Sequence, residues 1–236
     1  MTDKTGRGAG AGTGNGAGTG TDTDIGTGTG GFELRGINHL ALVCRDMERT
    51  VDFYTNVLGM PLVKTIELPA GMGQHFFFDC GGGDCLAFFW FPDAPDGVPG
   101  ISAPAARPDQ GDLTSAVGSM NHVAFDVAPE KIEEYRDRLI AAGVPCTEVA
   151  NHDDSEWGIS DGMHPGVFVR SVYFQDPDGI LLEFACWIRS FTPFDVAHAP
   201  AKAPAKVKDV ELAAEPELPA PPAPTATAPA ATGARV

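Results

Sequence analysis

A short pattern of apolar and polar positions occurs twice in this 236-residue chain. Residues 37–42 read INHLAL and residues 120–125 read MNHVAF, so each copy places apolar residues around an Asn-His pair. Alternation with a period of two predicts a half-buried β-strand whose successive side chains point to opposite faces. His39 and His122 therefore hold the same position in two similar strands, and each strand is expected to begin a similar structural unit.

A helix is predicted after each of these strands. In the first copy Asp46 is the predicted N-cap and Gly59 the predicted end of the helix. In the second copy Pro129 begins the helix and Gly143 ends it. Apolar residues follow at helical spacing in both: Val51, Tyr54 and Leu58 in the first helix, and Ile132, Tyr135, Leu139 and Ile140 in the second.

Three strand-like runs follow each predicted helix, so both copies have the order β-α-β-β-β. The runs are 61–68, 74–80 and 85–91 in the first copy, and 145–150, 167–174 and 180–187 in the second. A segment rich in proline and glycine, 92–118, connects the repeats of about 33–91 and 119–190. Neither unit alone can bury a sheet face, so we expect an α+β fold in which both units form one module, with a curled mixed sheet around a cleft.

Both ends of the chain differ in composition from the segment between them. Residues 1–31 hold 12 of the 29 glycines, and residues 193–236 hold 9 of the 20 prolines. Neither segment has enough large apolar side chains to offset the loss of chain entropy on folding. We therefore predict a disordered Gly/Thr-rich tail over 1–32, a folded domain over 33–192 and a disordered Ala/Pro-rich tail over 193–236.

The charge balance excludes some classes of partner. The chain has 32 acidic and 16 basic residues, a formal net charge of −16 and a pI of about 4.5, so nucleic acid or an anionic membrane would be repelled. No stretch approaches the roughly 20 apolar residues of a membrane span, and no secretory signal is visible. The five cysteines lack zinc-type spacing and are interpreted as reduced core thiols. We expect a cytoplasmic protein with no nucleic-acid or membrane partner.

Strand alternation gives the two repeated histidines a shared direction. His39 and His122 are both expected to point into the cleft between the repeats. A histidine in an apolar strand is more often a hydrogen-bonded core residue than a ligand, but the repeated position favours a binding role. Glu183 is the only carboxylate in the apolar run 180–187, where it is either an outward-facing side chain or a metal ligand.

The three candidate ligands define a donor set. Aligning the last strand of each repeat places Phe88 at the position of Glu183, so the first repeat offers no carboxylate there. Two histidines and one carboxylate with open positions are typical of non-haem Fe(II) oxygen chemistry, although Mn(II) or Zn(II) accepts the same donors. We therefore predict a metal centre formed by His39, His122 and Glu183, with Fe(II) as the expected ion.

With these features the chain resembles the vicinal oxygen chelate superfamily. The paired β-α-β-β-β units and the residues His39, His122 and Glu183 carry the resemblance, which covers about 35–190. The superfamily includes glyoxalase I, fosfomycin-resistance thiol transferases, methylmalonyl-CoA epimerase and type I extradiol catechol dioxygenases. The resemblance implies one module with a metal cleft, and it specifies the fold better than the reaction.

Residues 162–183, GMHPGVFVRSVYFQDPDGILLE, resemble the extradiol ring-cleavage signature, above all in the spacing from His164 to Tyr173. The resemblance implies an Fe(II)-dependent dioxygenase of aromatic hydrocarbon catabolism that opens a small aromatic diol with O2. Tyr173 would then hydrogen-bond the bound catecholate oxygen, and His164 would stabilise or protonate the oxygenated intermediate. Without the signature, His164 is a loop histidine and Tyr173 a core aromatic residue.

Further candidates come from the same comparison. Where two-domain extradiol enzymes have an acid/base histidine, this chain has Asp84, which burial could convert into a base but which also ends the turn sequence GGGD. Four residues are candidates for binding a flat apolar substrate: His152, Phe88, Trp90 and Trp187.

Two other interpretations stay open at this point. A glyoxalase-like metal-dependent lyase, isomerase or thiol transferase on the same scaffold would use Zn, Ni or Mn and consume no O2. A bleomycin-resistance-like binding protein would need no metal centre. A homo-oligomer is expected from the resemblance, because the exposed sheet edges of such modules often pair.

Overall fold

The computed structural model describes residues 32–202, and the chain divides after Thr192 into two units. The first unit holds all the strands and both α-helices described below. The second begins at Pro193 and contains the 3-10 turn Pro193–Asp195. The tails predicted over 1–32 and 193–236 lie mostly outside the described residues, so their predicted disorder stays a prediction.

The first repeat forms a four-stranded sheet with the strand order β1-β4-β3-β2. In it β1 runs parallel to β4, and the other neighbours are antiparallel. The parallel pair joins the first and last strands of the repeat, so the helix after β1 crosses over the sheet. The strands are β1 (His39–Cys44), β2 (Leu62–Glu67), β3 (Gln74–Gly81) and β4 (Asp84–Trp90).

The second repeat forms a separate five-stranded sheet with the order β5-β9-β8-β6-β7. Again the first and last strands, β5 and β9, are parallel. The additional strand is β7, which pairs antiparallel with β6 to form a short hairpin. The hydrophobic pattern does not predict this hairpin. The strands are β5 (Val123–Asp126), β6 (Ala150–His152), β7 (Ile159–Ser160), β8 (Val169–Gln175) and β9 (Leu181–Trp187).

The architecture is therefore two mixed β-sheets with few helices, which agrees with the predicted α+β class. One chain forms two separate sheets and not the predicted single sheet curled around a cleft. Cys146, in the predicted strand 145–150, forms only an isolated bridge to Phe174, and the strand itself begins at Ala150.

The helices begin and end close to the predicted residues. The first is α1 (Met47–Asp52), continued by a π-helical turn (Phe53–Val57), and the second is α2 (Ile132–Ala141), preceded by the 3-10 turn Pro129–Lys131. A further 3-10 turn, Pro69–Gly71, follows β2. The Asp46 carboxylate accepts the Arg49 N–H at 3.0 Å, which confirms the predicted N-cap. Gly59 and Gly143 follow the helices with φ of 77° and 74°, values that favour glycine.

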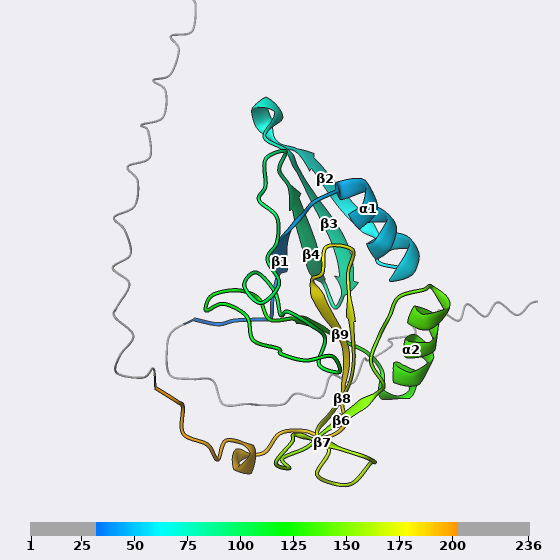
Figure 1. The fold of residues 1–236 in the computed structure, drawn as a ribbon, viewed down its shortest axis with the longest axis vertical. Helices are drawn as coiled ribbons and strands as arrows, with labels where there is room; N and C mark the ends of the chain where they lie inside the picture. The colour runs from blue at the N-terminus through cyan, green and yellow to red at the C-terminus, as the bar shows by residue number, and fades with distance from the viewer. Residues whose placement is uncertain (1–31, 203–236) are drawn as a thin grey trace, which may run out of the picture. The chain divides into compact units, whose positions relative to one another are not determined.

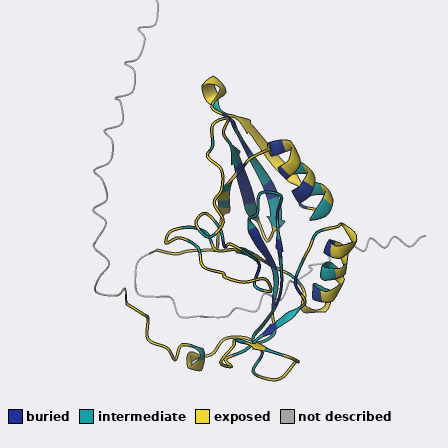
Figure 2. Ribbon diagram, in the orientation of Figure 1, coloured by how far each residue is buried: buried dark blue, intermediate teal, exposed yellow. Residues whose placement is uncertain are grey.

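Both helices lie on the same side of the two sheets and share one hydrophobic core with them (Figure 1). Buried positions follow the sheet strands and the inner sides of the helices (Figure 2). Of the predicted helix stripes, Tyr54, Ile132 and Leu139 are buried, whereas Ile140 is 51% exposed and lies off the stripe. The Tyr54 hydroxyl donates to the buried Asp176 carboxylate at 3.2 Å, which ties the first repeat to a turn of the second.

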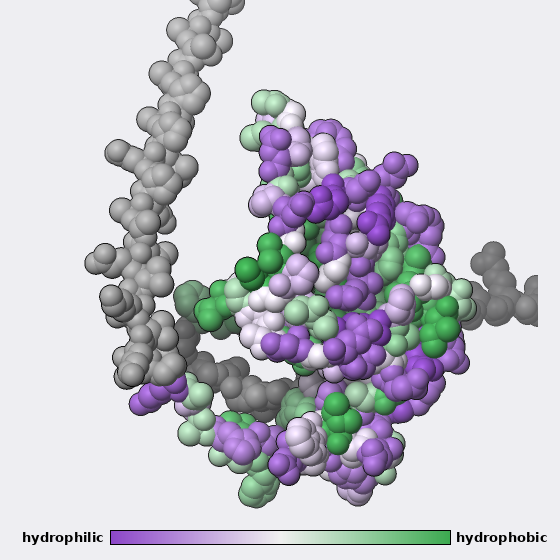
Figure 3. Space-filling view, viewed as in Figure 1, coloured by the Kyte–Doolittle hydropathy of each residue, from purple (hydrophilic) through white to green (hydrophobic). Residues whose placement is uncertain are grey.

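The opposite face of each sheet is not covered by a helix. Strand registers place His39, Val43 and Ile66 on that face of the first sheet, with Trp187 on that face of the second. Val43 is 50% exposed and Trp187 56% exposed. In the view of Figure 3, hydrophobic side chains form separate patches among hydrophilic ones. Within residues 32–202, no helix has both the length and the apolarity that crossing a membrane requires.

Candidate metal centre

Strand pairing in the second sheet places Glu183 between two candidate partners. Glu183 on β9 lies directly opposite Ala124 on β5 and Tyr173 on β8. His122 immediately precedes β5, on the same face as Ala124. His122, Glu183 and Tyr173 therefore meet on the face opposite the helices, although they are separated by up to 61 positions in the sequence.

The centre contains a close pair of metal-type donors. The Nε2 atom of His122 lies 2.9 Å from Oε2 of Glu183. The other ring nitrogen, Nδ1, lies 2.8 Å from Oδ1 of Asn121, whose own amide nitrogen donates to the Leu113 carbonyl. Since an amide oxygen only accepts, Nδ1 carries a hydrogen, and Nε2 is the ring atom that faces the carboxylate.

Two acceptors facing each other at this distance need a cation. A proton on Nε2 is one solution, and a metal ion is the other. Adjacent ligands at about 90° around a metal with bonds of about 2.1 Å are about 3 Å apart. The donor types and the 2.9 Å separation of His122 and Glu183 therefore fit two neighbouring positions of a divalent metal.

Glu183 is held in its charged form although it is only 5% exposed. Burial alone would raise the pKa of its carboxyl group, but hydrogen bonds from His122 and Ser171, together with the charge of His122, lower the pKa overall. The Ser171 hydroxyl donates to Oε1, so each carboxylate oxygen has a defined partner. A carboxylate fixed in this way is suited to bind a cation rather than a proton.

Tyr173 and His152 lie beside this pair. The Tyr173 ring meets the His122 ring edge-on, with centroids 5.8 Å apart, and its Oη lies 3.3 Å from Nε2 of His152. Burial, and then the charge of Glu183, raises the pKa of Tyr173 to about 12, so the phenol is neutral at physiological pH. His164, the other predicted catalytic residue, is exposed and its Nε2 lies 3.0 Å from Oδ2 of Asp153.

His39 lies elsewhere. It sits on the first sheet with its ring 5.6 Å from that of Phe77, and its Nδ1 lies 2.8 Å from Oδ1 of Asn38. Within residues 32–202, no three histidine, cysteine or carboxylate side chains come together in a way that could hold a metal ion. One chain thus brings two of the three predicted ligands together, and the three-residue assignment stays a prediction.

The structure corrects the predicted position of Phe88. In the first sheet the residue opposite Ala41 and Phe77 is Ala87, and this is the position that Glu183 holds in the second sheet. Phe88 points to the other face, where it is fully buried with its ring 4.9 Å from Tyr54. A core residue cannot contact a substrate, so Phe88 is removed from the predicted binding residues.

The other predicted residues are more scattered. Asp84 begins β4 directly after the glycine turn, and its carbonyl accepts from Cys80, as a hairpin residue does. The Trp90 ring nitrogen donates to the Arg45 carbonyl at 3.0 Å, and the ring packs against the core. Trp187 shares the face of Glu183 but lies four residues, or about 13 Å, further along β9, where it is exposed.

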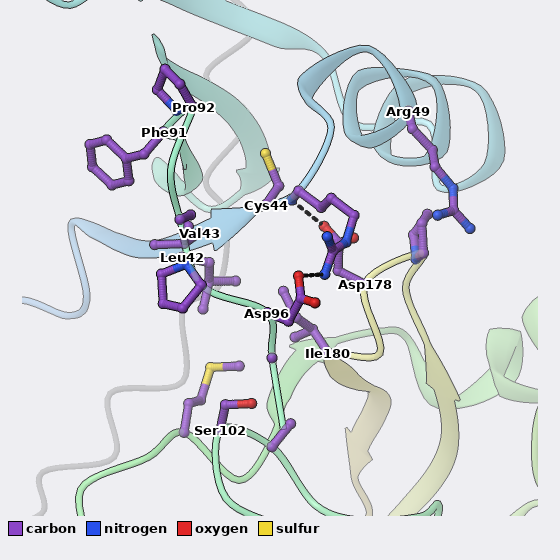
Figure 4. A pocket seen from close by; sticks show the side chains of 17 residues that line it. Leu42, Val43, Cys44, Arg49, Phe91, Pro92, Asp96, Ser102, Asp178 and Ile180 are labelled. Carbon is purple, nitrogen blue, oxygen red and sulfur yellow. Dashed lines mark hydrogen bonds and ion pairs between the residues drawn. The ribbon is translucent and has the colours of Figure 1, made fainter. Parts of the chain in front are cut away.

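A cavity of about 550 Å³ lies at the end of β1, between the crossover segment and the turn at Asp178 (Figure 4). Arg45 lines it, with its guanidinium paired to Asp96 and its backbone N–H donating to Asp178. None of the predicted metal ligands lines this cavity, so it does not belong to the candidate metal centre.

Three supporting residues escaped the sequence analysis. Asn38 and Asn121 each bind the Nδ1 side of the following histidine, and Ser171 holds Glu183. The signal for the asparagines was present, because the repeated pattern is Asn-His and not histidine alone. An asparagine that fixes the histidine tautomer is a typical supporting partner of a metal ligand. Nothing in the sequence distinguishes Ser171 from other strand serines.

The chain is similar to proteins of one superfamily. Residues 36–184 match the family described as Glyoxalase/Bleomycin resistance protein/Dioxygenase superfamily. The glutathione transferase FosA of Serratia marcescens is 29% identical over 150 residues, and the metallothiol transferase FosB of Shouchella clausii is 25% identical; each match spans 64% of this chain and 79% of the relative. The crystal structure of the fosfomycin resistance protein FosX from Listeria monocytogenes is 19% identical, with a TM-score of 0.42 over 65% of this chain and 94% of that one.

These relatives correct the prediction of an extradiol catechol dioxygenase. FosA and FosB are named as thiol transferases, whereas a ring-cleaving dioxygenase, MhqE of Bacillus subtilis, matches over only 48% of this chain and 33% of its own length at 27% identity. The physical reason lies in residues 162–183. They form a loop, the hairpin of β8 and β9 and the strand that carries Glu183, so the signature describes the scaffold of the centre more than its reaction.

Proposed function

The chain belongs to the Glyoxalase/Bleomycin resistance protein/Dioxygenase superfamily, and on this premise we propose that it is a metal-dependent enzyme that transfers a thiol to a small electrophile. FosA and FosB, both named as thiol transferases, support the reaction type. The observation that carries the proposal is the His122–Glu183 pair, two metal-type donors 2.9 Å apart with supporting residues that fix both of them. Fe(II), Mn(II) and Zn(II) all accept this donor set.

The third ligand in this proposal is His39 of a second copy of the chain. His39 has the same asparagine support as His122, and its sheet face is as little covered by helices. Around both histidines that face exposes apolar side chains, among them Val43, Ile66 and Trp187. Packing the first sheet of one copy against the second sheet of another would bury these side chains and complete two equivalent centres in a symmetric dimer.

In this proposal the residues around the ion have different roles. When bound, a divalent metal supplies a Lewis acid that polarises an oxygen of the electrophile. His122 and Glu183 hold the ion, and Ser171 keeps the carboxylate oriented. Tyr173 presents its hydroxyl beside them, where it can hydrogen-bond the thiol or the oxygen that is released, and Trp187 offers an apolar surface further along β9.

The test is a thiol-consumption assay. The purified full-length protein is loaded with Mn(II), Zn(II) or Fe(II) under anaerobic conditions and given fosfomycin as the epoxide with glutathione or cysteine as the thiol. We expect equimolar loss of thiol and epoxide that stops when the metal is chelated. No thiol loss with any of the three metals would contradict the proposal.

A further inference from the structure

We infer that the cavity at the end of β1 binds the α-amino acid group of a peptide thiol, with Arg49 on its carboxylate and Asp178 on its ammonium group. That this ligand is the thiol co-substrate rests on the proposed function, whereas the recognition of an α-amino acid group rests on the cavity itself. In a peptide thiol such as glutathione, the free α-amino acid group is several bonds from the sulfur, so the two ends of the molecule can occupy different sites.

The cavity lies close to the candidate metal centre without including its ligands. Its volume of about 550 Å³ is typical of a site for a small molecule. Met120 and Ile180 line it, and they precede His122 and Glu183 by two and three residues. An extended chain rises about 3.3 Å per residue, so the cavity wall lies within about 10 Å of both metal-type donors. A peptide thiol spans this distance, whereas free cysteine is too short.

Side chains of both charges line the cavity. Two arginines and two aspartates lie there, in a chain that has 16 basic residues against 32 acidic ones. Arg45 is already engaged, because its guanidinium pairs with Asp96 and its backbone N–H donates to Asp178 at 3.0 Å. The Arg49 guanidinium forms no ion pair with any residue within 32–202, and it reaches from α1 toward the turn that carries Asp178 (Figure 4).

A ligand that carries both charges suits this arrangement. The guanidinium of Arg49 can donate two parallel hydrogen bonds to one carboxylate. One carboxylate oxygen of Asp178 accepts the Arg45 N–H, and the carboxylate keeps further lone pairs for an ammonium group. A purely anionic ligand would be repelled by Asp96 and Asp178, and a purely cationic one by the two arginines. An α-amino acid group avoids both kinds of repulsion.

Apolar side chains form the rest of the cavity wall that the ligand would contact. Val43 and Phe91 both line the cavity and are 50% and 37% exposed. Contact with the methylene groups that separate the α-amino acid group from the thiol would remove this apolar surface from water. The cavity therefore matches a flexible chain with a charged end better than a compact, doubly charged ion.

Hydrogen bonds hold the two sides of the cavity in place. On the side of the β8–β9 turn, the N–H of Asp178 donates to the Asp176 carboxylate at 2.9 Å. On the side of the crossover segment, the N–H of Val98 donates to Oγ of Ser102, a residue that lines the cavity, at 2.9 Å. A site whose walls are already ordered loses less entropy when it binds a ligand.

Binding of S-methylglutathione to the metal-free full-length protein tests the cavity without turnover, because this thioether has no S–H to transfer. We expect saturable binding in an NMR titration, weakened at least about 10-fold in Arg49→Gln through loss of a charged hydrogen-bond pair. Arg138→Gln, an exposed arginine of α2 outside the cavity, is the matched control and should bind like the wild type. No saturable binding, or equal affinity in Arg49→Gln and wild type, would overturn the inference.

A second ligand tests the role of Asp178. N-acetyl-S-methylglutathione lacks the ammonium group, so we expect it to bind the wild-type protein more weakly than S-methylglutathione does. In Asp178→Asn, which keeps an acceptor for the Arg45 N–H, this difference should disappear. Equal affinity of the two thioethers for the wild-type protein would refute the contact between Asp178 and the ammonium group.

Kinetics separate the cavity from the metal centre. We expect Arg49→Gln to raise the KM for glutathione about 10-fold, while the KM for fosfomycin and the affinity for Mn(II) stay at their wild-type values. An unchanged KM for glutathione would contradict the inference. Absence of thiol transfer in the wild-type protein would instead overturn the proposed function, and the thioether titration would still decide whether the cavity binds an α-amino acid group.

Discussion

The two sheets have the same connectivity but different chemistry at the same positions. The second sheet has His122, Glu183 and Tyr173 where the first has His39, Ala87 and Phe77. In both, an asparagine precedes the histidine and binds its ring. Only the second sheet adds a carboxylate, a hydroxyl and the hairpin that supports His152.

This difference shows that the fold places a histidine in each sheet, whereas the neighbouring side chains determine whether a cation can bind there. The parallel first and last strands bring a histidine beside a central strand in both repeats. Whether a cation can bind there depends on one residue, Glu183 or Ala87, because a lone imidazole is a weak site. The first sheet therefore offers a single ligand, and the second offers a pair.

Removing the charge of Glu183, which the first sheet lacks at this position, should reduce metal affinity the most. Glu183→Gln keeps the size and an acceptor for Ser171 but removes the charge. We expect metal affinity to fall by more than about 100-fold, beyond the loss typical of a supporting residue. Isothermal titration with Mn(II) or Zn(II) measures it, with Glu148→Gln, a surface partner of Arg136, as the control. Unchanged affinity in Glu183→Gln would remove the carboxylate from the centre.

The repeated asparagines give the next largest effect. Asn121→Ala frees the His122 ring to rotate or change tautomer, and we expect metal affinity to fall about 10- to 100-fold. Asn38→Ala should cause a similar loss if His39 is the third ligand. If only Asn121→Ala weakens binding, the first sheet contributes nothing to the metal centre.

The link between the repeats can be broken at Tyr54. Tyr54→Phe removes the hydroxyl that donates to the buried Asp176 carboxylate, and we expect the free energy of unfolding to drop by roughly 1 to 3 kcal/mol. Urea denaturation measures the change. Asp176→Ala combined with Tyr54→Phe completes a double-mutant cycle, and additive effects would show that the two side chains do not interact.

The smallest expected effect is a pH dependence of stability. Burial raises the pKa of Asp176 to about 6, above its ordinary value of 3.8. The folded state thus holds this proton more tightly than the unfolded state, so the contribution is complete below pH 4 and is lost as the pH rises through 6. We expect Asp176→Asn to reduce the fall in stability between pH 4 and 7 by on the order of 1 kcal/mol. An identical pH profile of urea denaturation would contradict this.

Much of the fold was predictable because the signals are local. Asp46, Gly59 and Gly143 marked helix boundaries through capping and backbone conformation, which depend on neighbouring residues only. The register of β4 was not predictable. Residues 85–91 are apolar on both faces, so periodicity could not choose between Ala87 and Phe88, and a slip of one residue reverses the face.

The candidate site was predictable only in part, for a related reason. Alternation gave His122 and His39 a shared direction, but it left Glu183 as either an outward-facing side chain or a ligand, and only the strand pairing places Glu183 beside His122. For His39, alternation gave the face but could not say which side chains lie opposite it. The reaction could not be predicted from the sequence pattern. Residues 162–183 encode a hairpin and a ligand strand, which enzymes with different reactions can share.

In the proposed centre, His122 and Glu183 of one copy bind a metal together with His39 of another. Its most direct test mixes two inactive variants, His39→Ala and His122→Ala, by unfolding and refolding them together. We predict that neither variant alone binds the metal, and that each mixed dimer regains one binding site. If wild-type protein binds the metal but the refolded mixture does not, the claim of a centre shared between copies is wrong.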